Sequence, residues 1–116
     1  MAKVQSAKNT TATGAAMKAH ANKAAKLLRA MGNPQRLRVL CLLTEDEMSV
    51  GQINEQVDLS QSALSQHLAV LRAEELVETR RESQTIYYSL AAGPVRDVVK
   101  TLAKHYCAPA AKRARR

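Results

Sequence analysis

Residues 59–71, Leu59-Ser60-Gln61-Ser62-Ala63-Leu64-Ser65-Gln66-His67-Leu68-Ala69-Val70-Leu71, have the pattern of one amphipathic helix. Leu64, Leu68 and Leu71 recur at the i, i+4, i+7 spacing that puts apolar side chains on one face. Ser60 is a suitable N-cap. The opposite face is polar and nearly uncharged, which suits hydrogen bonding to base edges in a major groove but also fits a plain surface helix. This stretch alone favours the two interpretations about equally.

The segment just before this helix predicts a second, shorter helix. Ser49 and Gln52 have the spacing of a capping box, and Val50, Ile53 and Val57 lie on one face. Only a few residues separate the two helices. Two short helices joined by a tight turn, the second with a polar outer face, indicate a helix-turn-helix.

The segment after the polar helix predicts a β-hairpin. From Val77 to Glu82 and from Ile86 to Leu90 the apolar period is close to two, as in half-buried strands. The intervening Ser83-Gln84 has no glycine and is a weak turn signal. A hairpin directly after a helix-turn-helix is a wing.

Helices are also expected at both ends of the ordered chain. Residues 15–31 carry a narrow apolar seam that requires either a partner helix or the chain's own core. Asn33-Pro34 starts a second helix, and Gly93-Pro94 starts the last one. We expect one domain over residues 15–107, a disordered basic tail over residues 1–14 and a basic C-terminal tail over residues 108–116.

Charge is concentrated at the two ends of the chain. The 116 residues carry a formal charge of +8, and residues 15–107 account for only +2 of it. Basic tails favour nucleic acid through phosphate contact and counterion release, and they also suit anionic membranes or acidic proteins. No apolar run has the length of a signal peptide or a membrane span, so we expect a cytoplasmic protein with no membrane partner.

The order of elements and three motifs together resemble the ArsR/SmtB family of bacterial winged-helix repressors. The matching stretches are residues 31–43 (MGNPQRLRVLCLL), residues 59–72 (LSQSALSQHLAVLR) and Leu76-Val77. The sequence is most similar to the HlyU-, BigR- and SqrR-like thiol-sensing branch, which shares LSQSALSQHL and a cysteine in each of the second and last helices. The resemblance implies a mainly α, dimeric winged helix-turn-helix fold of order α-α-α-α-β-β-α.

The resemblance also implies a homodimer built on the first and last helices. This dimer would bind pseudo-palindromic double-stranded operator DNA and respond to an inducer. With the helical periodicity, it assigns base contacts to Gln61, Ser62, Ser65 and Gln66. It assigns backbone or minor-groove contacts to Ser60, Arg72, Arg80 and Arg81. His67 falls between the apolar positions and is expected to be a packing histidine.

Two cysteines, Cys41 and Cys107, are either inert packing residues or a redox pair. The resemblance places their helices close together, so we expect their oxidation or persulfidation to release the operator, with an oxidant or a persulfide as inducer. Metal sensing is the alternative. We expect no metal site and no cofactor, because the largest ligand set available is Cys41, His105 and Cys107, and Val99 stands where the family's second metal site has histidine.

Other function classes fit the sequence less well. No phosphate-binding glycine loop, nucleophile elbow or carboxylate pair is present, so we do not expect an enzyme. A sequence-independent nucleic-acid-binding protein would carry lysines and stacking aromatics on its reading face. The polar face of residues 59–71 carries neither.

Overall fold

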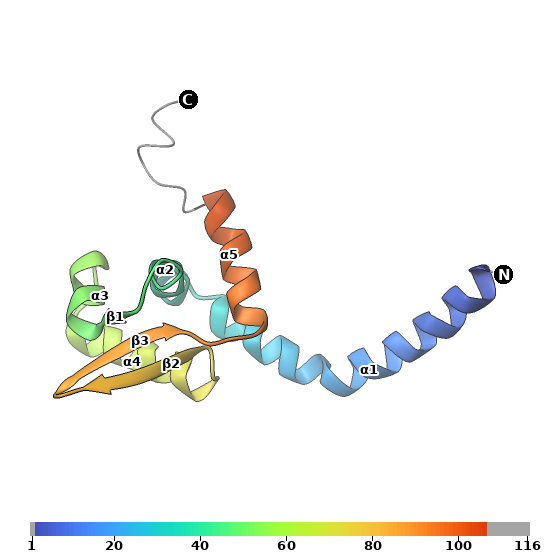
Figure 1. Cartoon of the computed structure of the whole chain (residues 1–116), viewed down its shortest axis with the longest axis horizontal. Coiled ribbons are helices and arrows are strands. Elements are labelled where there is room, and N and C mark those ends of the chain that lie inside the picture. The colour runs from blue at the N-terminus through green and yellow to red at the C-terminus, as the bar shows by residue number, and fades with distance from the viewer. Residues whose placement is uncertain (1, 107–116) are drawn as a thin grey trace, which may run out of the picture.

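The structure is a computed structural model that describes residues 2–106, with side chains described from residue 13 onward. Five helices accompany one antiparallel sheet whose strand order is β1-β3-β2 (Figure 1). The expected mainly α winged helix-turn-helix fold is therefore confirmed. The elements are α1 (Ala2–Met31), α2 (Pro34–Leu42), β1 (Met48–Ser49), α3 (Val50–Gln56), α4 (Gln61–Ala73), β2 (Val77–Glu82), β3 (Thr85–Leu90) and α5 (Pro94–Tyr106).

Helix α1 begins earlier than expected. Residues 2–14, which we expected to be a disordered tail, belong to this helix of 30 residues, which extends away from the other elements (Figure 1). These residues contain no Pro, but Val, Ser, Asn, Thr and Gly make up more than half of them, so helix propensity alone does not explain the extension. The expectation rested on missing apolar periodicity, which reports burial of a helix face rather than helicity itself.

The core lies where α2, α3, α4 and α5 meet. Helix α4 contributes Leu64, Leu68 and Leu71, each no more than 2% exposed. Aliphatic side chains from the other helices pack against them: Val39, Leu40, Ile53, Val95 and Val99. This core holds α4 by one face and leaves the other face to solvent.

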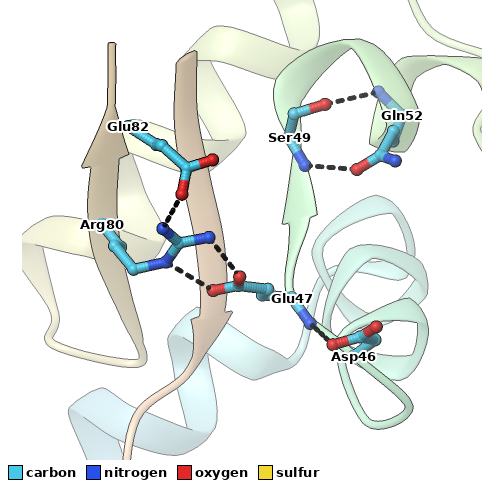
Figure 2. Close-up of polar contacts among 6 residues, drawn as sticks. All are labelled: Asp46, Glu47, Ser49, Gln52, Arg80 and Glu82. Carbon is cyan, nitrogen blue, oxygen red and sulfur yellow. Dashed lines mark hydrogen bonds and ion pairs between the residues drawn. The ribbon is translucent and has the colours of Figure 1, made fainter.

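The helix starts follow the capping signals in the sequence. The Asn33 side chain accepts hydrogen bonds from the backbone N–H groups of Gln35 (2.9 Å) and Arg36 (3.1 Å) at the start of α2. The capping box of α3 is formed as expected, with Ser49 Oγ accepting from Gln52 N and Gln52 Oε1 accepting from Ser49 N (Figure 2). These contacts satisfy backbone donors that the first helical turn leaves open.

The wing hairpin is formed by β2 and β3, in a register that runs from Val77 opposite Leu90 to Glu82 opposite Thr85. Ser83 has a φ of 58°, as the short turns that join twisted strands require, although the sequence offers no glycine there. Strand β1 was not expected: Met48 pairs with Tyr88 beside the hairpin. A strand of two residues is too short to show an alternating pattern, so its sequence carries no strand signal.

The apolar seam of α1 is left largely uncovered by this chain. Met17 is 57% exposed and Leu28 is 56% exposed, whereas Met31 at the end of the helix is buried in the core. The seam was expected to pack either on a partner helix or on the chain's own core. The chain's own core buries it only in the last turn of α1. Across residues 2–106, no helix combines the length and apolar character needed to cross a bilayer.

Candidate nucleic-acid interface

Helix α4 exposes an uncharged polar face over its N-terminal half. The four side chains expected to contact bases are all exposed and together line one shallow depression of the surface, which ends at Ala69: Gln61, Ser62, Ser65 and Gln66. Ser60 caps the helix by accepting from the backbone N–H of Ala63 at 3.1 Å, which leaves its hydroxyl proton available to an acceptor outside the chain. The structure thus brings the expected group together on one surface.

The turn between α3 and α4 is fixed by a side chain that we did not single out. Asn54 Nδ2 donates to the backbone carbonyl of Leu59 at 2.9 Å. Leu59 itself is partly buried against the core. These two contacts set where α4 begins relative to α3. Asn54 carries no recognisable sequence signal because its partner is a backbone atom.

His67 is half-buried, in agreement with its expected packing role. Arg36 Nη1 lies 3.4 Å from His67 Nδ1, so the two side chains meet between α2 and α4. The Arg36 side chain is partly buried. Its Nε donates to the carbonyl of Ala30 at 2.6 Å, so its side chain links the end of α1 to α4.

The two wing arginines lie in different surroundings. Arg81 is exposed, and among residues 13–106 its side chain has no hydrogen bond or ion pair. Arg80 binds Glu47 through two hydrogen bonds, Nε to Oε2 at 3.2 Å and Nη2 to Oε1 at 2.5 Å. Its Nη1 binds Glu82 at 3.0 Å (Figure 2). The guanidinium carbon lies 4.7 Å from the ring centroid of Tyr87.

These contacts change the protonation behaviour of the pair. Hydrogen bonding to Arg80 lowers the pKa of Glu47, so this carboxylate keeps its charge to lower pH than an unpaired glutamate does. Hydrogen bonding to Glu47, and then to Glu82, raises the pKa of Arg80 further above its ordinary value. We expected Arg80 at DNA, but in this structure its guanidinium is already bound by two carboxylates. Glu47 was not singled out, because it sits far from Arg80 in sequence.

Arg72, another expected backbone contact, is exposed in the last turn of α4. It is thus displaced along the helix from the depression near the N-terminus. Among residues 13–106 its side chain makes no ion pair. The position leaves its charge available to a phosphate beside the end of α4.

Cys41 lies on α2 and is half-buried. It lines a cavity of about 620 Å³ together with Arg38 of the same helix and Glu47, with the apolar side chains of Leu42 and Met48 also in the wall. Cys107 and the basic tail over residues 108–116 lie outside the described residues. Within residues 2–106, no three Cys, His, Asp or Glu side chains are grouped as a metal site requires.

Comparison with known proteins identifies the family of this chain. Residues 33–79, from the start of α2 into β2, match the bacterial regulatory proteins of the arsR family. The chain is 47% identical over 91 residues to the transcriptional activator HlyU of Vibrio cholerae, covering 78% of this chain and 84% of that protein. It is 40% identical over 92 residues to the biofilm growth-associated repressor of Xylella fastidiosa, covering 79% and 81%.

Comparison with solved structures supports the same family. Reduced HlyU from Vibrio cholerae superposes with a TM-score of 0.74, covering 78% of this chain and 96% of that one. A homodimeric winged helix-turn-helix DNA-binding domain from Mycobacterium bovis, 29% identical, superposes with a TM-score of 0.68 over 75% of this chain and 81% of that one. Relatives of this kind are DNA-binding regulators rather than enzymes. The chain belongs to the arsR family of bacterial regulatory proteins and is a winged helix-turn-helix, DNA-binding transcriptional regulator.

Proposed function

We propose that this regulator is a thiol-responsive repressor that reads an operator with the exposed face of α4. The observation that carries the proposal is the composition of that face: amides and hydroxyls are exposed there over a fully buried leucine stripe. Gln can pair with adenine through two hydrogen bonds, and Ser can donate or accept. Base contacts are assigned to Gln61, Ser62, Ser65 and Gln66.

Contacts to the DNA backbone are assigned around this face. Ser60 has a free hydroxyl donor at the start of α4, and Arg72 is exposed at its end. Arg81 is exposed on the wing with no competing carboxylate among the described residues. Such contacts supply sequence-independent affinity and fix the register of the helix on the duplex.

The protein is proposed to act as a homodimer through α1 and α5. The exposed seam of α1 and the 77% exposed Tyr106 at the end of α5 are apolar surfaces that a second copy would cover. The Mycobacterium bovis relative is described as homodimeric. A two-fold dimer places two copies of α4 on half-sites about one helical turn of DNA apart.

The switch is assigned to Cys41 and Cys107. With peroxide, one thiolate attacks the O–O bond and becomes a sulfenic acid as hydroxide leaves. The second thiolate then attacks the sulfenic sulfur, and the disulfide forms as a second hydroxide leaves. With a small-molecule persulfide, one cysteine thiolate attacks the outer sulfur and becomes a cysteine persulfide as the donor leaves as a thiolate. The other cysteine then attacks the inner sulfur, and the disulfide forms as hydrosulfide leaves. The position of Cys41 on α2, which packs against α4, supports a route from this chemistry to the reading helix.

Fluorescence anisotropy with a duplex enriched by the wild-type protein from a randomised pool tests the switch. The dithiothreitol-treated protein is expected to bind this duplex, and peroxide or persulfide is expected to weaken binding. Cys41→Ser and Cys107→Ser are each expected to bind in both states. Intact mass of the same samples reports the bridge. Equal affinity of wild type before and after complete thiol oxidation would rule out the switch.

A further inference from the structure

The wing hairpin is joined to the body through a short stretch of sheet. Strand β1 has two residues, and α3 begins immediately after it. Its Met48 and Ser49 pair with Tyr88 and Tyr87 of β3, the central strand. This pairing and the burial of Val77, Tyr88 and Leu90 in the core together set the orientation of the wing relative to the helix-turn-helix.

A polar ladder crosses the outer face of this connection. Side chains alternate along β2 and β3, so Tyr88 is buried whereas Arg80 and Tyr87, which oppose each other, share the outer face. From β2 the Arg80 guanidinium reaches Glu47, the residue before β1 (Figure 2). On the way it lies over the Tyr87 ring. The contact links both edges of the sheet over its central strand.

The charges in this ladder argue against a DNA role for Arg80. Its three nitrogen atoms all donate to carboxylates, and with Glu47 and Glu82 it forms a cluster of net charge −1. A phosphate would have to displace a carboxylate and approach a net negative group. Arg81, its neighbour, points to the opposite face of β2 because strand side chains alternate.

We propose that Arg80 and Glu47 are positioning residues that brace the wing against the body, and that Arg81 is the wing's phosphate contact. This inference rests on the proposed DNA binding by α4 and the wing. Because the brace already restricts the motion of the hairpin in the free protein, less conformational entropy is lost on binding DNA. Removing the brace therefore weakens binding without removing a phosphate contact. Arg80 makes two hydrogen bonds to Glu47 and stacks on the Tyr87 ring, and together these contacts fix the orientation of its guanidinium.

A double-mutant cycle in the full-length protein separates a brace from a DNA contact. The variants are Glu47→Gln, Arg80→Gln and the double variant, with Glu45→Gln as the matched control. Glu45 is exposed in the same loop and loses the same charge, but it has no ion pair among residues 13–106. Operator binding is measured over a series of salt concentrations, with thermal unfolding to show that each variant is folded.

For a brace, Glu47→Gln and Arg80→Gln each weaken operator binding roughly two- to fivefold relative to Glu45→Gln. The double variant is no weaker than either single variant, and the salt slope is unchanged in all three. Arg81→Gln instead flattens the slope by about 0.9 per lost phosphate contact. Amide hydrogen exchange in β2 and β3 becomes faster in Glu47→Gln and Arg80→Gln only.

A different pattern would overturn the brace. A flatter salt slope in Arg80→Gln, or tighter binding with a steeper slope in Glu47→Gln, makes Arg80 a DNA contact that Glu47 restrains. Additive losses in the double variant also contradict it. If wild type binds the enriched duplex no better than a random duplex, then the proposed sequence-specific function has failed, and this outcome is distinct from a failure of the brace.

Discussion

At the scale of single residues, Glu75 has an unusual backbone conformation for its side chain. It follows α4 with a φ of 63°, in the left-handed region where Cβ is crowded. The N–H of Leu76 donates to the carbonyl of Leu71, and that of Glu75 to Arg72, which is the Schellman arrangement that usually carries glycine. The chain thus places a strained residue between the reading helix and the wing.

Replacing Glu75 with Gly should therefore stabilise the protein, by about 1 kcal/mol, because the relief of crowding exceeds the extra entropy of the unfolded chain. Glu74→Gly is the control, since it removes the same charge at a residue with a φ of −89°. Chemical denaturation measures both. A gain in Glu74→Gly equal to that in Glu75→Gly would point to charge rather than backbone strain.

Gln66 is expected to discriminate between bases. Gln66→Ala should cost about 1–3 kcal/mol of preference for the matched base pair while leaving binding to random duplex nearly unchanged, because the amide is proposed to contact a base edge. Arg81→Ala should instead weaken binding to every duplex alike. Competition between the enriched and random duplexes measures both effects. An equal loss on both duplexes for Gln66→Ala would remove it from the base contacts.

At the scale of elements, α4 separates stability from recognition by face. Leu64 is fully buried, whereas Ser65, the next residue, is exposed. The two positions lie on different faces because successive residues are rotated by about 100° around a helix. Neighbouring substitutions should therefore affect different properties.

Leu64→Ala is expected to lower the free energy of unfolding by about 2–5 kcal/mol, since it leaves a cavity in the core. Ser65→Ala should change stability by no more than about 0.5 kcal/mol and reduce discrimination between duplexes. Urea denaturation and competitive binding on both variants check this division. A large loss of stability in Ser65→Ala would show that its hydroxyl supports the fold instead.

Local signals explain how much of the fold and site was predictable. The caps at Asn33, Ser49 and Ser60 act within three residues, so the sequence alone locates the starts of α2, α3 and α4. The polar face of α4 follows from helical periodicity in the same way. By contrast, Arg36 reaches His67, and Arg80 reaches Glu47, across more than thirty positions of the chain. Neither residue type nor spacing predicts such pairs, because tertiary packing selects them.

At the scale of the whole molecule, the apolar surface is unevenly distributed. The core has no Phe or Trp and relies on aliphatic side chains, while Met17 and Leu28 on α1 remain more than half exposed. Small cores of this kind gain stability when a second copy covers further apolar surface. Covering the exposed seam by a second copy would therefore add to the stability of the fold.

Leu28→Glu is expected to dissociate the proposed dimer, because it would place a charge on the seam that the second copy would cover. Asn22→Glu is the matched control: it adds the same charge at an exposed position on a different side of α1. Sedimentation velocity measures the assembly, and operator binding should be lost together with the dimer. A dimeric Leu28→Glu protein would place the interface elsewhere.

The one-sided burial of α4 also has an evolutionary consequence. Substitutions at Gln61, Ser62, Ser65 or Gln66 alter exposed side chains and leave the leucine stripe beneath them in place. If these side chains read bases as proposed, two copies that arise by gene duplication can acquire different target promoters without passing through unstable intermediates. Selection for folding acts on one side of the helix, and divergence of regulatory networks proceeds on the other.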